Sequence, residues 1–487
     1  VIPEKKQDDV FRIVVFGGGQ ANGWPSPQYG FWRMVEAMLR ERYPGVRFEV
    51  INASFGFTSS VVIREIAEAA LDRLDPDLLL LYAGGNEFIG AYGPSNPFTL
   101  GGVVPPMPWI RASLWLSDLR VYQWAARPLR RLVEKRPFHL GNPVSASRVA
   151  RVYRHLETNL NAICKAASRH GTSVVLCTEG ANLRSWPPDR TLDTRALSPD
   201  DLHRFDQLYD EAVALEKDGD LHGAIRRYGE AEALSATDAR VLYRLGRCWW
   251  KLGELEEART CFEDSLERSA YGFSRAKKKS LDIVRRTAET WAGHGVRLAD
   301  AQERLVALSP GHVPGLEFFA DQVHPTLEGA HVIATAAFES IAAELASRGI
   351  HGDHTPLDFE RCETLLGANA TAFAGAFRSS LEFLRSREDG GLGDFDVLEK
   401  RLEKVQDEAN RLSLKTVEDG LREALRQAGE DFLLHVELAL NLVSNGNTED
   451  ALREATQVAE AFPWRRLAQR LKGDCEVRAG KPDAAAN

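Results

Sequence analysis

The first third of the chain alternates short apolar runs with segments whose apolar residues recur at helical spacing. The runs cover residues 13–16, 48–52 and 78–82, and their length is typical of buried strands. The intervening segments, 30–42 and 61–74, carry apolar residues every three or four positions, as one face of a helix does. This order of elements predicts a parallel sheet with helices on both faces.

Two further strands are expected much later in the chain. Residues 173–177 and 296–299 are short apolar runs. Each follows a segment with helical periodicity, 149–169 in the first case and 274–292 in the second. The predicted sheet is therefore assembled from distant parts of the sequence.

Between the fourth and fifth expected strands, the sequence repeats itself with a period of 34 residues. The residues Tyr209, Ala212, Gly219, Leu221, Ala224 and Tyr228 recur as Tyr243, Gly246, Gly253, Leu255, Ala258 and Phe262. Small residues at helix crossings and glycine between helices, at this period, resemble the tetratricopeptide (TPR) repeat. Because paired TPR helices bury their apolar faces only by stacking, we expect an all-α insertion over 201–273.

The same period returns near the C-terminus. There Ala439, Asn445, Gly446, Asp450 and Ala451 match Gly473, Ala479, Gly480, Ala484 and Ala485. The charged stretch 395–442 predicts more helices of the same array. With boundaries expected at segments 349–356 and 390–393, which are rich in glycine or proline, we predict a C-terminal TPR-like helical domain over 357–487.

The rest of the chain, 11–200 and 274–350, forms the predicted α/β domain. Within it, residues 90–145 are rich in Pro, Gly and Trp and then become amphipathic and basic. We expect this stretch to be a cap or surface insertion over the site; the alternatives are a partner-docking surface or an interfacial helix over 109–136 that contacts a membrane surface. The interfacial helix would place Trp115, Leu116, Val121 and Trp124 in the membrane and Arg127, Arg130 and Arg131 at head-group level.

Composition narrows the classes of function. A chain of 487 residues is long enough for two to four domains, and its formal net charge of −9 argues against a nucleic-acid partner. No run of about 18 apolar residues exists that would span a bilayer. The six cysteines show neither disulfide-like nor metal-site spacing, so we expect buried, unpaired thiols and no metal.

Two separate segments carry candidate chemistry for acyl transfer. Residues 12–24 predict a buried strand that runs into a Gly-rich turn. Asp321 and His324 follow the last expected strand and precede a helix. Acyl transfer needs a nucleophile, a base, a group that orients the base and donors for the oxyanion. A lone Asp-x-x-His is weak evidence, so the pair counts only in this context.

Four segments, in order, resemble the blocks of the SGNH (GDSL-type) hydrolase family. Residues 17–23 are similar to the first block, which is normally Gly-Asp-Ser, and 50–57 are similar to the second. Residues 81–87 resemble the third block, Gly-x-Asn-Asp, and 321–325 resemble the last, Asp-x-x-His. The resemblance implies a flavodoxin-like parallel sheet and an ester hydrolase or O-acyl transferase that uses no cofactor.

The resemblance also implies a role for each matching residue. Asp321 would fix the tautomer of the general base His324, and Gly19 stands at the nucleophile position. The oxyanion hole would comprise the Asn86 side chain with backbone amides of Gly19 and of Gly56 or Phe57. These residues are the predicted catalytic set.

This chain departs from the family pattern at three positions. Gly19 replaces the nucleophilic serine, Gly18 replaces the usual aspartate, and Phe57 replaces a glycine that acts through its backbone. Without a side chain, Gly19 cannot carry an acyl group. Ser26, Ser54, Ser59 and Ser60 are other hydroxyls of the domain, but none occupies the turn after the first strand.

Other interpretations of the same residues stay open. Asn86 could cap a turn, and His324 with Asp321 could be structural. Glu87 is expected at an exposed rim of the pocket, where it would contact substrate; the alternative is a catalytic acid. Gln20 and Asn22 either stabilise the turn or contact a ligand.

The arrangement resembles bacterial GDSL-like proteins that contain TPR repeats, which implies an acylated, in some cases carbohydrate, substrate. Many of these are secreted or anchored, and the polar lead-in that begins at Val1 would suit a processed N-terminus. We therefore expect a periplasmic or membrane-anchored bacterial protein, with a cytoplasmic protein as the alternative.

Three hypotheses of function follow. The chain is a hydrolase or acyl transferase whose serine has been replaced, a pseudo-enzyme that binds an acyl or sugar ligand and recruits a protein or peptide through its TPR helices, or a TPR scaffold that keeps the sheet for stability.

Overall fold

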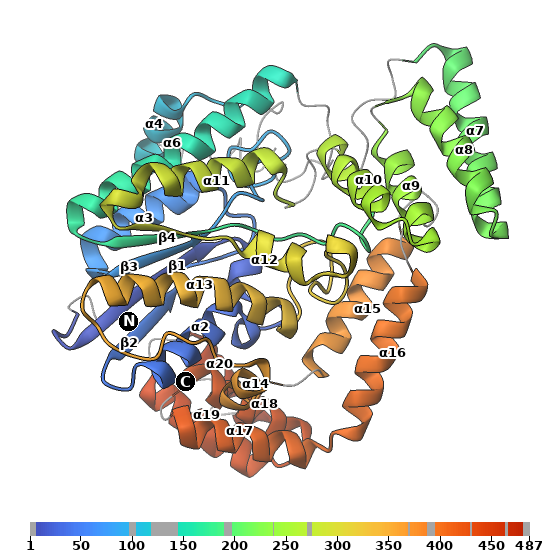
Figure 1. The fold of residues 1–487 in the computed structure, drawn as a ribbon. Helices are drawn as coiled ribbons and strands as arrows, with labels where there is room; N and C mark the ends of the chain where they lie inside the picture. Colours follow the sequence, from blue (N-terminus) through green and yellow to red (C-terminus); the bar gives the residue numbers. More distant parts are fainter. Residues whose placement is uncertain are drawn as a thin grey trace.

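A single parallel sheet lies at the centre of the computed structural model (Figure 1), which describes residues 6–96, 104–117, 145–188, 197–236, 238–269, 275–368, 371–386, 395–428, 431–462 and 466–480. Its strands are β1 (Val10–Gly17), β2 (Arg47–Asn52), β3 (Leu78–Tyr82), β4 (Ser173–Cys177) and β5 (Val296–Ala299). They pair in the order β2-β1-β3-β4-β5, which is the flavodoxin-like order. The expected α/β fold class and its strands are confirmed.

The register of the strands brings their carboxyl ends to one edge of the sheet. Gly17 pairs with Tyr82, Tyr82 with Cys177, and Cys177 with Ala299. The loops that follow these strands therefore start side by side. In open α/β sheets, ligands bind outside this edge.

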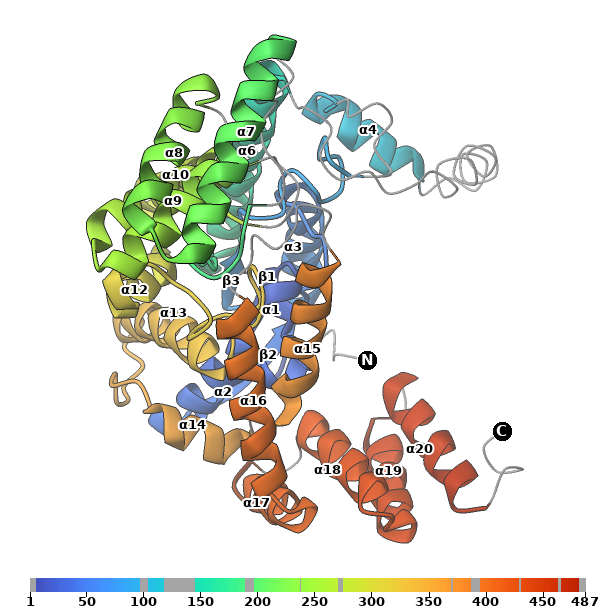
Figure 2. The same cartoon turned by 90° about the vertical axis from the view of Figure 1, so that its right-hand side faces the viewer.

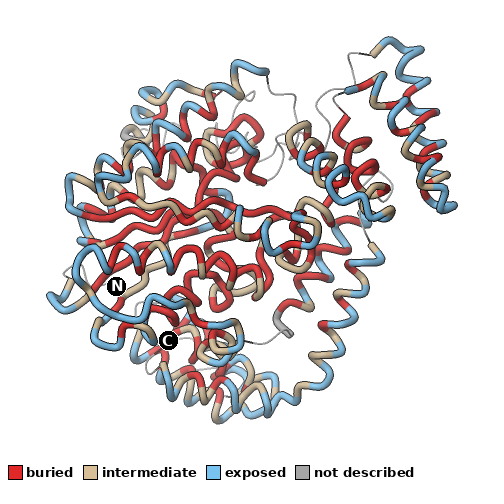
Figure 3. Tube along the Cα trace, in the orientation of Figure 1, coloured by how far each residue is buried: buried red, intermediate tan, exposed pale blue. Residues whose placement is uncertain are grey.

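Helices cover both faces of the sheet (Figure 1). One face carries α2 (Phe31–Arg42), α12 (Ala301–Leu308) and α13 (Leu327–Ser347), and the other carries α3 (Ser60–Leu74), α6 (Ala146–His170) and α11 (Lys278–Trp291). Alternate strand residues feed the two cores, with Ile13 and Val15 on the α2 face and Val14 and Phe16 on the α3 face. Figure 3 shows this buried interior.

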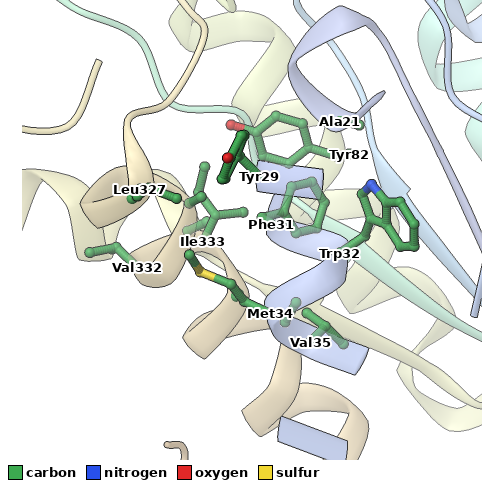
Figure 4. Packing of buried hydrophobic residues seen from close by; sticks show 14 of the residues in the cluster. Ala21, Tyr29, Phe31, Trp32, Met34, Val35, Tyr82, Leu327, Val332 and Ile333 are labelled. Atoms are coloured by element: carbon green, nitrogen blue, oxygen red, sulfur yellow. The ribbon is translucent and has the colours of Figure 1, made fainter. Parts of the chain in front are cut away.

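The core on the α2 face fixes the turn that follows β1. Figure 4 shows Phe31 and Met34 of α2 packed with Tyr82 of β3 and Ile333 of α13. Ala21, from the turn itself, belongs to the same cluster and is fully buried. The turn is therefore anchored by apolar packing as well as by its backbone.

The inserted repeat forms two helical hairpins. Its helices are α7 (Pro199–Asp218), α8 (Leu221–Leu234), α9 (Ala239–Leu252) and α10 (Leu255–Arg268). Gly219 and Gly253 end the first helix of each hairpin in the left-handed region, with φ of 86° and 84°, which glycine adopts without steric cost. Ala224 and Ala258 are fully buried at the helix crossings, as the repeat pattern predicts.

The C-terminal helices divide into two groups (Figure 2). The first comprises α14 (Phe359–Leu366), α15 (Thr371–Arg385) and α16 (Phe395–Arg411), and the second α17 (Leu414–Ala428), α18 (Phe432–Ser444), α19 (Thr448–Ala461) and α20 (Arg466–Arg478). The first group packs into the core on the α2 face of the sheet. Only the second group has a hydrophobic core of its own, which begins at Leu421.

The stretch 90–145 is described in part. Its helix α4 (Met107–Ser117) buries Ile110, exposes Trp109 and pairs Arg111 with Glu68 of α3 at 3.2 Å. Residues 118–144 lie outside the described residues, and with them the positions Val121, Trp124, Arg127, Arg130 and Arg131 on which the membrane-surface prediction depends.

The described part of the chain contains neither a membrane-spanning helix nor a metal cluster. No helix there is long and apolar enough to cross a bilayer, and no cluster of His, Cys, Asp or Glu there has the arrangement of a metal site. All six cysteines are free thiols, of which only Cys261 is partly exposed.

Candidate active site

The turn after β1 places Gly19 at the carboxyl edge of the sheet. It opens the one-turn helix α1 (Gly19–Asn22), in which the amides of Asn22 and Gly23 bond to the carbonyls of Gly18 and Gly19 at 3.0 and 3.2 Å. A Cβ atom at Gly17 would lie 2.6 Å from the Tyr82 carbonyl oxygen. Glycine at position 17 therefore lets the turn pass close to β3.

Position 19 faces the imidazole of His324. A Cβ atom with ideal geometry at Gly19 would lie 3.1 Å from Nε2 of His324 and 3.9 Å from Cα of Gly56. A serine hydroxyl there would fall within hydrogen-bonding reach of Nε2 after a shift of a few tenths of an ångström. The structure thus brings together the turn and the histidine that the sequence predicts.

His324 is paired with Asp321. Its Nδ1 lies 2.6 Å from Oδ2 of the carboxylate, while Oδ1 accepts the amides of Val323 and His324 at 2.8 and 2.7 Å. With Nδ1 donating to the carboxylate, neutral His324 has Nε2 free to accept a proton on the side of position 19. This is the orientation that a general base requires.

The pair shifts the pKa of both members in the directions expected for a base and its orienting acid. Burial disfavours the imidazolium, but the charge of Asp321 and its hydrogen bond outweigh burial and raise the pKa of His324. Burial likewise opposes ionisation of Asp321, yet the charge and hydrogen bonds of His324 and the backbone amides hold its pKa below the usual range. The carboxylate therefore stays charged at neutral pH.

Several segments hold this pair in place. The Ala320 amide donates to the His324 carbonyl at 2.9 Å, and Asn182, from the loop after β4, donates through Nδ2 to the Asp321 carbonyl at 3.0 Å. Ser380 of α15 donates to the Ala320 carbonyl at 2.9 Å. The segment that carries the pair is therefore anchored by the β4 loop and by α15.

Asn86 lies against the glycine turn. It is buried in the loop after β3, and a Cβ atom at Gly18 would lie only 2.0 Å from its Nδ2. The amide therefore occupies the space that a side chain at position 18 would need. In this conformation, glycine at position 18 leaves that space to the Asn86 amide.

Gly56 and Phe57 lie in the loop after β2. This loop is tied to the glycine turn, because Asn52 donates through Nδ2 to the Asn22 carbonyl at 3.2 Å and the Phe55 amide donates to the Gly17 carbonyl at 3.4 Å. Phe57 has φ of 57°, the left-handed region that favours glycine. Phe57 therefore has a backbone conformation that glycine adopts more readily.

Gln20 and Asn22 lie within the turn. Gln20 is buried, with its Oε1 beside Gly18. Asn22 is half-buried, and its carbonyl accepts hydrogen bonds from Asn52 and from the Trp32 indole at 3.2 and 3.3 Å. These contacts stabilise the turn; contact with a ligand remains a prediction for both residues.

Glu87 is not an exposed rim residue, so that expectation is wrong. Its two carboxyl oxygens accept from the Ser60 amide and the Ser60 hydroxyl, both at 2.7 Å, and Asn159 donates to that hydroxyl at 3.1 Å. Burial raises the pKa of Glu87 to about 7, against hydrogen bonds from Ser60 that lower it. The N-terminus of α3 thus supplies the hydrogen-bond donors that Glu87 needs. The local sequence around Glu87 does not reveal this partner.

Three features of the site were not predicted from the sequence. Trp24 stacks obliquely near His324, with ring centroids 5.1 Å apart. Glu179 is buried after β4, where burial and then the charge of Glu87 raise its pKa well above the usual range. The position of Glu179 just after a strand could have indicated its place at this edge of the sheet. Ser380 is the third feature, and only the tertiary fold brings it to the site.

The four other candidate serines are engaged elsewhere. Their hydroxyls donate to Glu437 (Ser26), the Val15 carbonyl (Ser54), the Ala91 carbonyl (Ser59) and Glu87 (Ser60). Position 19 therefore remains the one that faces His324 within the described residues.

Comparison with known proteins identifies the repeats. Residues 215–270 and 436–486 each match a family model described as tetratricopeptide repeat, so both helical regions contain TPR repeats. No curated protein matches the chain.

Solved structures similar to the chain fall into two groups. An α/β hydrolase enzyme from the metagenome of Lake Arreo, Spain, is 13% identical over 70% of this chain and 95% of its own, with a TM-score of 0.31. A GDSL-like lipase from Bacteroides thetaiotaomicron is 10% identical over 68% and 88%, with a TM-score of 0.31. A tetratricopeptide repeat protein from Parabacteroides merdae is 14% identical over 58% and 90%, with a TM-score of 0.16.

Proposed function

We propose that the carboxyl edge of the sheet is an SGNH-type site for an acylated ligand, which the chain binds as written and would hydrolyse with serine at position 19. The observation that carries the proposal is the alignment of position 19 with Nε2 of His324, itself paired with Asp321. One nitrogen of His324 is thus held by the Asp321 carboxylate while the other is directed toward position 19, which supports a role as a base.

The geometry supports the following steps for such a reaction. A hydroxyl at position 19 would attack the ester carbonyl carbon while Nε2 of His324 takes its proton, and that proton then passes to the departing alcohol. The Gly19 amide and the Asn86 side chain would donate to the oxyanion. Water, deprotonated by the same imidazole, would release the acyl group. Gly19 has no side-chain oxygen to attack the ester, so the unaltered chain cannot form an acyl-enzyme at this position.

The test is recovery of activity. Gly19→Ser is expected to hydrolyse p-nitrophenyl acetate at a rate at least about 10³-fold above the unaltered chain, and Gly19→Ser/His324→Ala should lose that gain. Circular dichroism would confirm that each variant is folded. A folded Gly19→Ser protein that is inactive, or activity that survives loss of His324, would contradict the proposal.

The TPR repeats favour a second role, in recruiting a protein. Paired TPR helices present extended concave surfaces for a protein or peptide. A hydrogen bond also connects the last group of helices to the loop beside the site. Ser26, two residues after Trp24, donates to Glu437 of α18 at 2.9 Å. We propose that a partner recruited by the repeats is thereby held beside the acyl site.

A further inference from the structure

Two exposed aromatic rings flank the point at which the β2 loop approaches position 19. Phe55 and Phe57 immediately precede and follow Gly56, whose Cα is 3.9 Å from a Cβ placed at Gly19. Their exposed fractions are 47% and 59%, and neither belongs to a hydrophobic cluster of the described residues. Core packing therefore does not account for these rings.

The backbone conformation at position 57 is unfavourable for phenylalanine. At φ of 57° a bulky side chain is disfavoured, whereas glycine is not. Burial of the ring does not compensate, since most of it is in solvent. Strain of this kind that persists beside a candidate site indicates a functional role for the side chain.

Hydrogen bonds order the backbone of the loop that carries both rings. The Ser54 amide donates to Oδ1 of Asn52 at 3.0 Å, and the Thr58 hydroxyl donates to the Phe55 carbonyl at 2.6 Å. A third aromatic residue, Trp24, lies against His324. The backbone that carries Phe55 and Phe57 is thus ordered next to position 19.

We propose that Phe55 and Phe57 bind the acyl chain of the ligand and select chains longer than acetyl. This inference rests on the proposed function, because it assigns the substrate of the same site. The rings carry no hydrogen-bonding atom, so they suit a saturated hydrocarbon chain better than a sugar, whose hydroxyls would need polar partners. Both are sequence neighbours of Gly56, the residue of this loop that comes within 3.9 Å of a Cβ at position 19.

The first experiment uses the unaltered chain, because a chain without a serine at position 19 should leave the ligand intact. Isothermal titration with hexanoate and with acetate should show binding of hexanoate alone, and Phe57→Gly or Phe55→Ala should weaken it about tenfold. Leu440→Ala removes a similarly exposed apolar side chain on α18 and should leave binding unchanged. Equal affinity of the unaltered chain and both phenylalanine variants for hexanoate would overturn the inference.

The second experiment measures selectivity in the Gly19→Ser background. The ratio of kcat/KM for p-nitrophenyl hexanoate over acetate should fall about tenfold with Phe57→Gly, while glucose pentaacetate is not preferred over p-nitrophenyl acetate. An unchanged ratio, or a preference for the sugar ester that depends on Phe57, would refute chain selection. If the serine variant is inactive but hexanoate binding depends on Phe57, the proposed hydrolysis fails and the binding inference stands.

Discussion

The two halves of the candidate site are built very differently. The base half is complete: Asp321 accepts three hydrogen bonds from Val323 and His324, and the segment is anchored by α15 and the β4 loop. The nucleophile half consists of three consecutive glycines, Gly17 to Gly19. Two of them have close neighbours that a side chain would meet, whereas the third has space that opens toward His324.

This difference indicates how far each of the three glycines is structural. Gly17 passes the Tyr82 backbone carbonyl, so packing requires it, and a side chain at position 18 would displace the ends of the Asn86 and Gln20 side chains. Gly19 has negative φ, and the nearest atom to a Cβ there is Nε2 of His324 at 3.1 Å. The site is therefore compatible with a serine at position 19 after a small shift, whereas a side chain at position 18 would move Asn86.

The largest expected effect comes from breaking the base half. In the Gly19→Ser background, Asp321→Asn should lower kcat by about 10⁴-fold, because the imidazole would lose both its tautomer and the charge that stabilises imidazolium. The assay is p-nitrophenyl acetate hydrolysis. A loss of less than tenfold would mean that Asp321 does not orient the base.

The next largest effect comes from filling position 18. In the same background, Gly18→Ala should displace Asn86 and lower kcat by about 10²-fold to 10³-fold through loss of an oxyanion donor. Asn86→Ala should cost a similar factor, and the double variant should cost little more than either alone. Additive losses would show that the two residues act separately.

Glu87, the residue after Asn86, should make the free energy of unfolding depend on pH. The folded pKa of Glu87 is raised to about 7 from an ordinary 4.5, so between these values the folded state holds a proton that the unfolded state loses. Stability should therefore fall as pH rises from 4.5 to 7, by roughly 3 kcal/mol from this group. Urea unfolding of Glu87→Gln at pH 5 and pH 8 should show a smaller difference than the unaltered chain; an identical difference would contradict the assignment.

The smallest effect concerns the titration of the base. Since the pKa of His324 is raised above its ordinary 6.5, kcat/KM of Gly19→Ser should increase with pH through a midpoint above 6.5 and then level off. A pH-rate profile measures this midpoint. A midpoint below 6.5 would indicate that burial outweighs Asp321 in the active form.

The sequence predicts the inner strands β1, β3 and β4 well because each is a short, mainly apolar run that is buried on both faces. The expected bounds of β3, β4 and β5 match those observed. Long-range features could not be predicted in this way. Nothing local indicates that Ser380 would reach Ala320 or that Leu398 of α16 would join the core of the sheet.

The error at Glu87 has the same origin. An acidic residue in a loop is usually solvated, and its burial becomes understandable only once α3 directs the Ser60 amide and hydroxyl at it. The pairing of Asp321 with His324 was accessible because both residues lie within one short motif. Sequence thus predicted the base half more fully than the pocket that surrounds it.

The most direct test of the proposed site, in which position 19 would hold the nucleophile, is covalent labelling of that position. Intact and peptide mass spectrometry after treatment with diisopropyl fluorophosphate needs no knowledge of the substrate. We predict a single phosphoryl adduct on the introduced hydroxyl of Gly19→Ser, and none on the unaltered chain or on Gly19→Ser/His324→Ala. A folded Gly19→Ser protein that stays unlabelled would contradict the account.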